Sequence, residues 1–385
     1  MSQSVNEEQN KQIGGKKNKI LAWLGVIALV YLLITAVSLI SSGFKLAAGE
    51  QAEELFAFAT NPFAGLIVGT MATALIQSSS TVTSIIVGLV AGGLPVTIAV
   101  PMIMGSNIGT TITNTLVSLG HISSKEEFRK AFAAATIHDF FNLISVVIFL
   151  PLETTTHFLE QIALFISQFL IGGESKSMDR FNVIKEIIAP FANLIKELTG
   201  IFTEPFDGLA LIVIGIGLIF LSILYIGKLL KVLMVGKAKV MLRTAIGKSP
   251  IISIFSGTVV TIFVQSSSTT TSLVVPLAGT GLLTLEEIYP FTLGANIGTC
   301  ITALLAATAV TDNTVAALEI AMVHFLYNVF GVIVIYGIPF LRNLPILGAK
   351  NLANIASEKK YIALLYIITV FFFLPGILLA ITSIK

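Results

Sequence analysis

The residues best suited to chemistry form two hydroxyl-rich segments of nearly the same sequence. Residues 77–84 read Gln-Ser-Ser-Ser-Thr-Val-Thr-Ser and residues 265–272 read Gln-Ser-Ser-Ser-Thr-Thr-Thr-Ser, with seven identities in eight at an offset of 188. Hydroxyl and amide oxygens can bind a cation, whereas side-chain donors and the free backbone N–H groups of a helix break can bind an anion. We therefore expect both segments to bind ions.

Two further motifs are duplicated in the same order, and their nearly constant spacing defines two homologous halves, 20–151 and 205–341. Both Gly-x-Asn-Ile-Gly-Thr copies lie in apolar helices, where the asparagine offers an amide oxygen and threonines three residues apart share a helix face. Close helix packing is the alternative role for these small residues. The duplicated residues are Gly105 to Thr110 and Gly294 to Thr299, then His138 with Asn142 and His324 with Asn328.

An ion bound at these motifs is not held by formal charge, because residues 61–120 and 249–285 contain no Asp, Glu, Lys or Arg. Helix N-termini carry roughly half a positive charge each, so two hairpin tips that face each other form an oxyanion site. The C-terminal ends and unwound carbonyls of the same broken helices suit Na⁺. One element can thus serve a substrate and a coupling ion.

The composition of the 385 residues excludes soluble enzymes and nucleic-acid-binding proteins. Hydrophobic residues make up 55% and charged residues 11% of the chain, and the mean hydropathy is +0.93. Ordinary globular proteins carry about 25% charged residues. The net charge of +2 creates no global field, and the single cysteine, Cys300, excludes an internal disulfide and a metal site of several thiolates.

Apolar runs long enough to cross a bilayer predict an all-α polytopic membrane protein with seven crossings. Two other runs, 62–93 and 249–281, are too long for one helix and are interrupted by the hydroxyl-rich segments. We expect them to form re-entrant hairpins, since irregular backbone at membrane depth is tolerated only beside protein or a water-filled cavity. The predicted crossings are 20–43, 95–120, 131–151, 205–227, 285–310, 314–341 and 361–383.

Lysine and arginine in the loops set the expected orientation, because positive loops remain cytoplasmic. Residues 1–19 form a cytoplasmic segment, 152–204 an extracytoplasmic connection, and 342–385 a cytoplasmic loop followed by the last membrane helix. Three crossings per half make the second half enter inverted, and each half then contains a re-entrant hairpin and a discontinuous helix. Such inverted-topology repeats are typical of secondary transporters, and a channel is the weaker interpretation.

Asp139 is an acidic residue well inside a membrane helix, where a charged group is costly and faces a partner or a cavity. It shares a helix face with Asn142 and could share a Na⁺ or a proton with it. For His138 and His324 the alternative role is a hydrogen bond between helices. For Glu319 it is a position at the membrane interface. Adjacent His138 and Asp139 cannot form the geometry of a nucleophilic triad, so we do not expect an enzyme.

The paired Gln-Ser-Ser-Ser tips, the Gly-x-Asn-Ile-Gly-Thr copies, Phe128-Arg129-Lys130-Ala131-Phe132 and residues 136–142 together resemble the type II sodium-dependent phosphate cotransporters. The resemblance implies phosphate uptake coupled to Na⁺, without a further cofactor, in an integral multi-pass protein of the cell membrane. It implies phosphate contacts from both tips. These are Gln77, Ser78, Ser79, Ser80, Gln265, Ser266, Ser267 and Ser268.

The resemblance also implies Na⁺ ligands at the tips and in the neighbouring helices. Ala295 stands where many relatives have a serine, and Cys300 replaces the threonine found at Thr111 in the first half, so we expect one Na⁺ site to be altered. The compact chain is typical of bacterial members. We expect a Na⁺-coupled phosphate symporter in the lipid bilayer, with another oxyanion or a small carboxylate as the alternative substrate and a homodimer as an open option. The expected Na⁺ ligands are Gln77, Asn107, Thr110, Thr113, Asp139, Asn142, Gln265, Ser266, Asn296, Thr299 and Thr302.

Overall fold

The computed structural model describes residues 2–48, 61–171, 178–246, 249–310 and 313–377, and these residues contain helices and no strand. Six of the helical segments are long and apolar enough to cross a membrane, which agrees with six of the seven predicted crossings. The seventh appears as a shorter apolar helix, Tyr361–Ile377. The predicted end of that crossing, residue 383, lies outside the described residues. The six long segments are Lys19–Ala47, Val96–His121, Lys125–Thr156, Phe206–Leu230, Leu285–Ala307 and Thr314–Tyr336.

The first half begins with the long helix α1 and continues through a helix pair joined at Gln77 and Ser78. Its next helix stops at Gly109 and resumes at Ile112, so the predicted discontinuous helix is present in this half. The helices are α1 (Ser2–Ala48), α3 (Pro62–Ile76), α4 (Ser79–Gly92), α5 (Val96–Gly109), α6 (Ile112–Ser118), the 3-10 turn η3 (Leu119–His121) and α7 (Lys125–Thr156).

The second half repeats this order with one difference in where its helices break. The helix that carries Gly294 to Thr299 is continuous. The interruption in this half lies in the return arm of the helix pair, at Leu273 and Val274. The helices are α10 (Phe206–Ala245), α11 (Pro250–Val264), α12 (Ser267–Ser272), α13 (Val275–Gly279), α14 (Leu285–Ala307), α15 (Thr314–Gly331) and the π-helical turn η4 (Val332–Tyr336).

Matching sequence signals start the first helix of each pair. Asn61 caps α3 by accepting a hydrogen bond from the Phe63 N–H, and Ser249 caps α11 in the same way at Ile252. A proline follows each cap at the first helical position, where its missing N–H costs nothing and its fixed φ suits the helix. The two pairs therefore begin by the same local chemistry.

Glycines let two helices of each half approach until their backbones touch. A Cβ at Gly105 of α5 would overlap the carbonyl oxygen of Leu66 in α3, and a Cβ at Gly294 of α14 would overlap that of Ile254 in α11. Small residues at such positions permit the close crossings found between membrane helices. The glycines of the duplicated Gly-x-Asn-Ile-Gly-Thr motif thus pack each helix onto its own hairpin.

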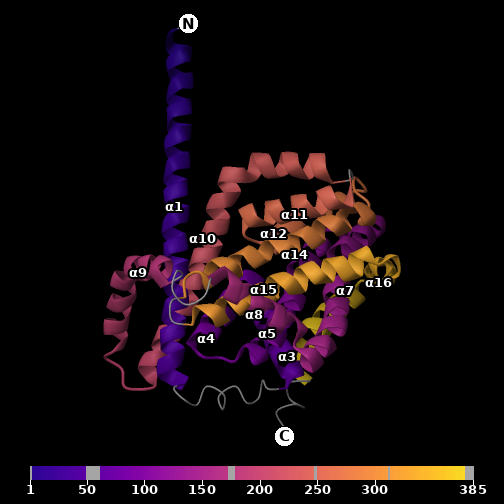
Figure 1. Ribbon diagram of the computed structural model, residues 1–385. Coiled ribbons are helices and arrows are strands. Elements are labelled where there is room, and N and C mark those ends of the chain that lie inside the picture. The colour runs from indigo at the N-terminus through magenta and orange to yellow at the C-terminus, as the bar shows by residue number, and fades with distance from the viewer. Residues whose placement is uncertain (1, 49–60, 172–177, 247–248, 311–312, 378–385) are drawn as a thin grey trace.

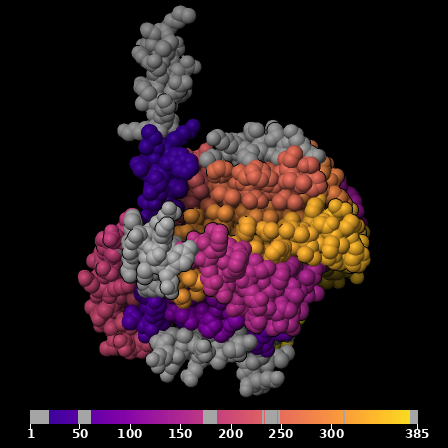
Figure 2. Space-filling view, viewed as in Figure 1, coloured from indigo at the N-terminus to yellow at the C-terminus, as the bar shows by residue number. Residues whose placement is uncertain are grey.

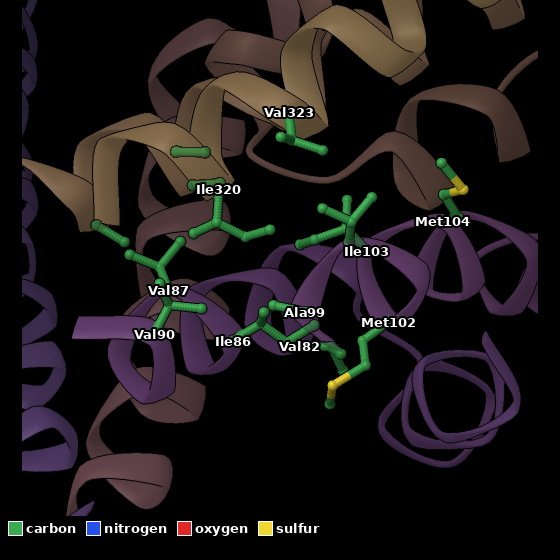
Figure 3. Packing of buried hydrophobic residues seen from close by; sticks show 14 of the residues in the cluster. Val82, Ile86, Val87, Val90, Ala99, Met102, Ile103, Met104, Ile320 and Val323 are labelled. Carbon is green, nitrogen blue, oxygen red and sulfur yellow. The ribbon is translucent and has the colours of Figure 1, made fainter. Parts of the chain in front are cut away.

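The largest cluster of buried apolar residues joins the two halves. Side chains of α4 and α5, such as Val87 and Ile103, point toward Ile320 and Val323 of α15 (Figure 3). Because α15 belongs to the second half, this cluster spans both halves. The contact fixes the position of the first hairpin relative to the second half.

Helices outside the repeated units cover the flanks of the molecule. The segment expected as a connection, 152–204, is mostly helical: α8 (Phe158–Ile171) packs against α15, and α9 (Met178–Thr199) packs against α1. Figure 2 shows the magenta surface of α7 and α8 directly against the orange surface of the second half and the yellow-orange surface of α16 that follows it. After the second half come α16 (Pro339–Glu358), α17 (Tyr361–Ile368) and the π-helical turn η5 (Thr369–Phe373).

Large apolar side chains remain exposed on the outer faces of these helices. Phe169 of α8, Val213 of α10 and Ile251 of α11 are 77%, 68% and 79% exposed. Apolar side chains in such positions suit contact with lipid tails and would be unfavourable in water. Together with the six long apolar segments, they identify an integral membrane protein.

Candidate functional site

Each helix pair turns through the same two backbone conformations. Gln77 and Gln265 adopt left-handed φ values of 56° and 55° and end α3 and α11. The next residues, Ser78 and Ser266, are extended and cap α4 and α12: their Oγ atoms accept hydrogen bonds from the N–H groups of Thr81 and Thr269 at 3.2 and 3.1 Å. The duplicated sequence therefore produces duplicated turns.

The two turns face one cavity of about 320 Å³. Glutamine, serine and threonine side chains from each turn line it, and the remaining wall comes from α10. The cavity is mostly apolar apart from these groups, which is the usual composition of a small-ligand site. Its lining residues are Ile76, Gln77, Ser78, Thr81, Phe220, Ile223, Leu224, Gly227, Lys228, Val264, Gln265, Ser266 and Thr269.

Only part of each Gln-Ser-Ser-Ser segment lines the cavity. The glutamine and first serine of each copy do so, whereas the second and third serines are buried within the first turns of α4 and α12. Ser268, for example, donates to the Thr110 carbonyl oxygen of the other half at 3.1 Å. The cavity uses Thr81 and Thr269 instead, which lie one helical turn beyond the caps and were not among the predicted residues. Helical periodicity after the cap is the signal that could have identified them.

Lys228 was also missed as a site residue, because it directly follows the predicted crossing 205–227 and belongs to none of the duplicated motifs. It is the one formal charge among the described lining residues, and its ammonium lies 4.8 Å from the ring centroid of Tyr225. The side chain is exposed, so the cavity reaches the surface beside it. A positive charge at the mouth of a cavity attracts anions.

One of the predicted Na⁺ ligands beside the second tip, Thr302, is hydrogen-bonded to it. Thr302 of α14 donates to the Gln265 Oε1 atom at 2.8 Å, while Thr299 donates to the Ala295 carbonyl oxygen of the preceding turn. In the first half the counterpart of Thr302 behaves differently: the Thr113 hydroxyl is buried and has no hydrogen-bond partner within the described residues. Thr110, like Thr299, bonds to its own preceding turn, at Ser106.

The predicted asparagine ligands meet in a network that crosses between the halves. Asn107 Oδ1 faces His324 Nε2 at 3.3 Å, and Asn296 Oδ1 faces His138 Nε2 at 2.6 Å. Asn107 also donates to Asn328 at 3.1 Å. In the matching contact of the other copy, Asn296 donates a hydrogen bond to Asn142 at 2.9 Å. Each half thus supplies an asparagine to the histidine and asparagine of the other, and this buried network adds a polar contact to the apolar one between them.

Asp139 lies beside this network but has a different partner. Its Oδ2 atom accepts a hydrogen bond of 2.7 Å from the hydroxyl of Tyr366 in α17, and its Oδ1 atom is buried without a hydrogen-bond partner within the described residues. The Thr111 hydroxyl, at the break between α5 and α6, donates to the Ile108 carbonyl oxygen at 3.0 Å and leaves this Oδ1 atom unfilled. A buried carboxylate with an unfilled oxygen is a suitable Na⁺ ligand.

The broken segments of the two halves contact each other. Asn114 of α6 donates to the Thr271 hydroxyl of α12 at 2.7 Å, and that hydroxyl lies 3.0 Å from the Asn114 Oδ1 atom. The carbonyl of Thr110, freed by the break in the first half, accepts the hydrogen bond from Ser268 described above. The breaks are therefore satisfied across the interface, as buried backbone groups require.

Comparison with known proteins gives a consistent set of relatives. The family model described as Na⁺/Pi-cotransporter matches residues 32–174 and 218–340, which contain both copies of every duplicated motif. The chain is 34% identical over 442 residues to sodium-dependent phosphate transport protein 2B of Homo sapiens, covering 91% of this chain and 64% of that protein.

A second relative gives the same result. Identity to sodium-dependent phosphate transport protein 2A of Rattus norvegicus is 34% over 444 residues, covering 96% of this chain and 69% of that protein. The chain therefore spans about two thirds of the length of these relatives, slightly less for the 2B proteins. No solved structure matches the chain.

Proposed function

The chain belongs to the Na⁺/Pi-cotransporter family, and on that premise we propose that it is a sodium-coupled symporter of inorganic phosphate in the cell membrane. The observation that carries the proposal is the single cavity faced by both Gln-Ser tips, with Lys228 at its mouth. Relatives named as sodium-dependent phosphate transport proteins support the choice of substrate.

Phosphate binding follows from the donors that line this cavity. The amides of Gln77 and Gln265 and the hydroxyls of Thr81 and Thr269 can donate to phosphate oxygens. The first backbone N–H groups of α4 lie at the same turn, where the helix dipole favours an anion. Lys228 supplies a formal positive charge at the entrance. The site thus holds a small, doubly charged oxyanion mainly by neutral donors.

Alternating access requires that the cavity open to each side in turn. We infer that residues 20–151 and 205–341 are inverted repeats whose re-entrant hairpins, α3 with α4 and α11 with α12, enter from opposite sides. Figure 1 supports this arrangement, since α11 and α12 lie in the upper part of the molecule and α3 and α4 in the lower part. Because the cavity opens beside Lys228, at the lysine-rich and hence cytoplasmic end of α10, we assign this structure to a cytoplasm-facing state.

We propose that the coupling Na⁺ ions bind at two of the positions described above, beside Gln265 and beside Asp139. A Na⁺ bound by Gln265 and Thr302 would touch the second tip directly, and a Na⁺ at the unfilled Oδ1 atom of Asp139 would require Tyr366 to share the carboxylate. Positive charge beside the cavity raises the affinity for phosphate. By linkage, bound phosphate raises the affinity for Na⁺ by the same factor.

The first test is uptake of radiolabelled phosphate into proteoliposomes under an inward Na⁺ gradient or an equal K⁺ gradient. We expect accumulation only with Na⁺, and we expect Gln77→Ala and Gln265→Ala each to reduce uptake. Leu75→Ala, on the exposed outer face of α3, is the matched control. Equal uptake with Na⁺ and K⁺ would contradict the proposal and indicate a uniporter or channel.

The role of Asp139 has its own readout. Asp139→Asn is expected to lower the charge moved per phosphate while leaving phosphate transport measurable, because the amide keeps the shape but loses the negative charge. The ratio of current to flux in a voltage-clamped membrane measures this quantity. A ratio equal to that of the parent would remove Asp139 from the coupling mechanism.

Another oxyanion or a small carboxylate is the alternative substrate, since hydroxyl and amide donors do not by themselves specify a tetrahedral anion. Competition of labelled phosphate uptake by sulfate, arsenate and short dicarboxylates separates these cases. We expect inhibition by arsenate, which has the shape and charge of phosphate. Stronger inhibition by a dicarboxylate would favour the alternative.

A further inference from the structure

A second cavity, of about 300 Å³, lies apart from the two tips. It is bounded by the first turns of α7, the loop between α13 and α14, and one face of α16. Both α7 and α16 carry the lysine and arginine residues that assign this side to the cytoplasm. The lining residues are Arg129, Lys130, Ala133, Ala278, Gly281, Leu283, Thr284, Leu285, Glu286, Lys350, Ala353 and Asn354.

The charged residues of this lining are mostly positive. Arg129, Lys130 and Lys350 face a single lining carboxylate, that of Glu286, to which Lys350 is joined by an ion pair of 2.7 Å. The side chain of Lys130 has no ion pair within the described residues, and its ammonium lies beside Gly281. The balance of charge in the cavity is thus positive, and an anion would find unpaired charge there.

Arg129 has donors left over after its contacts within the protein. One terminal nitrogen, Nη2, binds Glu126 at 2.7 Å, and the other, Nη1, lies 3.4 Å from the Asn354 side chain. The Nε atom is buried and has no hydrogen-bond partner within the described residues. A buried unpaired donor is unfavourable, and an anion that accepted from it would remove that cost.

We propose that this cavity binds a phosphate group through Arg129, Lys130 and Lys350. Guanidinium and ammonium groups are the usual partners of phosphate, and Arg129 can offer Nε together with a terminal nitrogen. Basic pockets between membrane helices on the cytoplasmic side take the headgroups of anionic lipids. Free phosphate in the cytoplasm carries the same chemistry, and the apolar residues Leu283 and Leu285 also line the cavity.

A ligand at this position would join three parts of the molecule. Arg129 and Lys130 belong to the first half, the loop with Gly281 and Thr284 belongs to the second half, and Lys350 and Asn354 lie on α16 beyond both. A bound phosphate group therefore favours whichever arrangement of the halves brings these cations together. The site is a regulatory site, and it is independent of whether the tips transport phosphate.

The test measures binding to the full-length purified chain and needs no transport. In the first arm, native mass spectrometry compares retention of phosphatidylglycerol and phosphatidylcholine by the parent, by Arg129→Gln with Lys130→Gln, and by the control Lys359→Gln with Lys360→Gln. The control removes the same charge from exposed lysines between α16 and α17. In the second arm, thermal melting in Na⁺-free potassium phosphate is compared with melting in potassium chloride of equal ionic strength.

Selective retention of phosphatidylglycerol that is weakened roughly tenfold or more in the Arg129/Lys130 variant, but not in the control, identifies a lipid headgroup. Thermal stabilisation by potassium phosphate that is lost in the Arg129/Lys130 variant, but not in the control, identifies free phosphate as the ligand. If the Arg129/Lys130 variant equals the control in both arms, the proposal is overturned. Should the double variant not fold, Lys130→Gln against Lys359→Gln gives the same comparison, because the exposed Lys130 has no ion pair to lose.

Discussion

The two halves are built alike where they pack and differently where ions are expected to bind. Gly105 and Gly294 bring their helices into backbone contact in the same way, and Asn107 and Asn296 exchange matching hydrogen bonds with the other half. By contrast, the first half breaks after Gly109, whereas the second half breaks within its hairpin. Packing is thus symmetric and the polar breaks are not.

The asymmetry extends to single side chains. Gln265 accepts a hydrogen bond from Thr302, but Gln77 is exposed and Thr113 is left without a partner within the described residues. Asp139 occurs in the first half, and the residue at the matching offset of 186 is Phe325. A duplicated scaffold can therefore carry unequal cation sites, because the side chains that differ lie outside the contacts that hold the halves together.

The largest effect is expected where the symmetry is strictest. Gly105→Ala and Gly294→Ala should each destabilise the protein by about 3 kcal/mol or more, because the new Cβ overlaps a backbone carbonyl that cannot move aside. Thermal melting and the yield of monodisperse protein measure the change. Gly217→Ala is the control, since a Cβ there meets no atom within 4 Å. A tolerated change at one glycine alone would show that the two packings differ.

Substitutions in the asparagine network should destabilise the protein less than the glycine substitutions do, and by the same amount in both halves. Asn107→Ala leaves His324 and Asn328 without their partner, and Asn296→Ala leaves His138 and Asn142. Each change should cost about 2 kcal/mol, the scale for leaving a buried polar group unpaired. The two melting temperatures should agree with each other. A large difference would break the comparison and point to an ion or water held on one side.

Matching substitutions near the helix breaks should have unequal effects on stability in the two halves. Thr271→Val is expected to cost about 1 kcal/mol, because it leaves both polar atoms of Asn114 unpaired across the interface. The matching change Thr83→Val removes only a local bond of 3.3 Å to the Ser80 carbonyl oxygen and should be nearly neutral. Melting temperature and phosphate uptake check both variants. Equal losses would mean that the breaks do not distinguish the halves.

The smallest effect concerns the wall of the cavity, which comes from α10 of the second half and from no described residue of α1. Lys228→Gln should weaken apparent phosphate affinity only a few-fold, since an exposed charge is screened by solvent and salt. The difference from the parent should shrink as ionic strength rises. Lys359→Gln serves as the control for charge removed from the same side. An effect that did not depend on salt would indicate a direct contact with phosphate.

Much of the fold could be predicted from the sequence because its signals are local. Apolar length identified six helices that the structure contains, and the glutamine before each serine cap marks where both hairpins turn. The repeat also gave the correct pairing of the Gly-x-Asn-Ile-Gly-Thr motifs. It could not give the continuity of α14, because whether a glycine-containing helix breaks depends on partners such as Ser268 and Thr271 from elsewhere in the chain.

In the candidate site, too, some features follow from local sequence and others from tertiary packing. The sequence alone determined that two uncharged, hydroxyl-rich turns exist and that each is preceded by a capped helix, since caps and turns involve only neighbouring residues. Only the tertiary structure decided that Gln77, Thr81, Gln265 and Thr269 share a cavity with Lys228, and that Tyr366 reaches Asp139 from a helix beyond both halves. These contacts join residues far apart in the chain, and packing between helices, which no local pattern encodes, selects them.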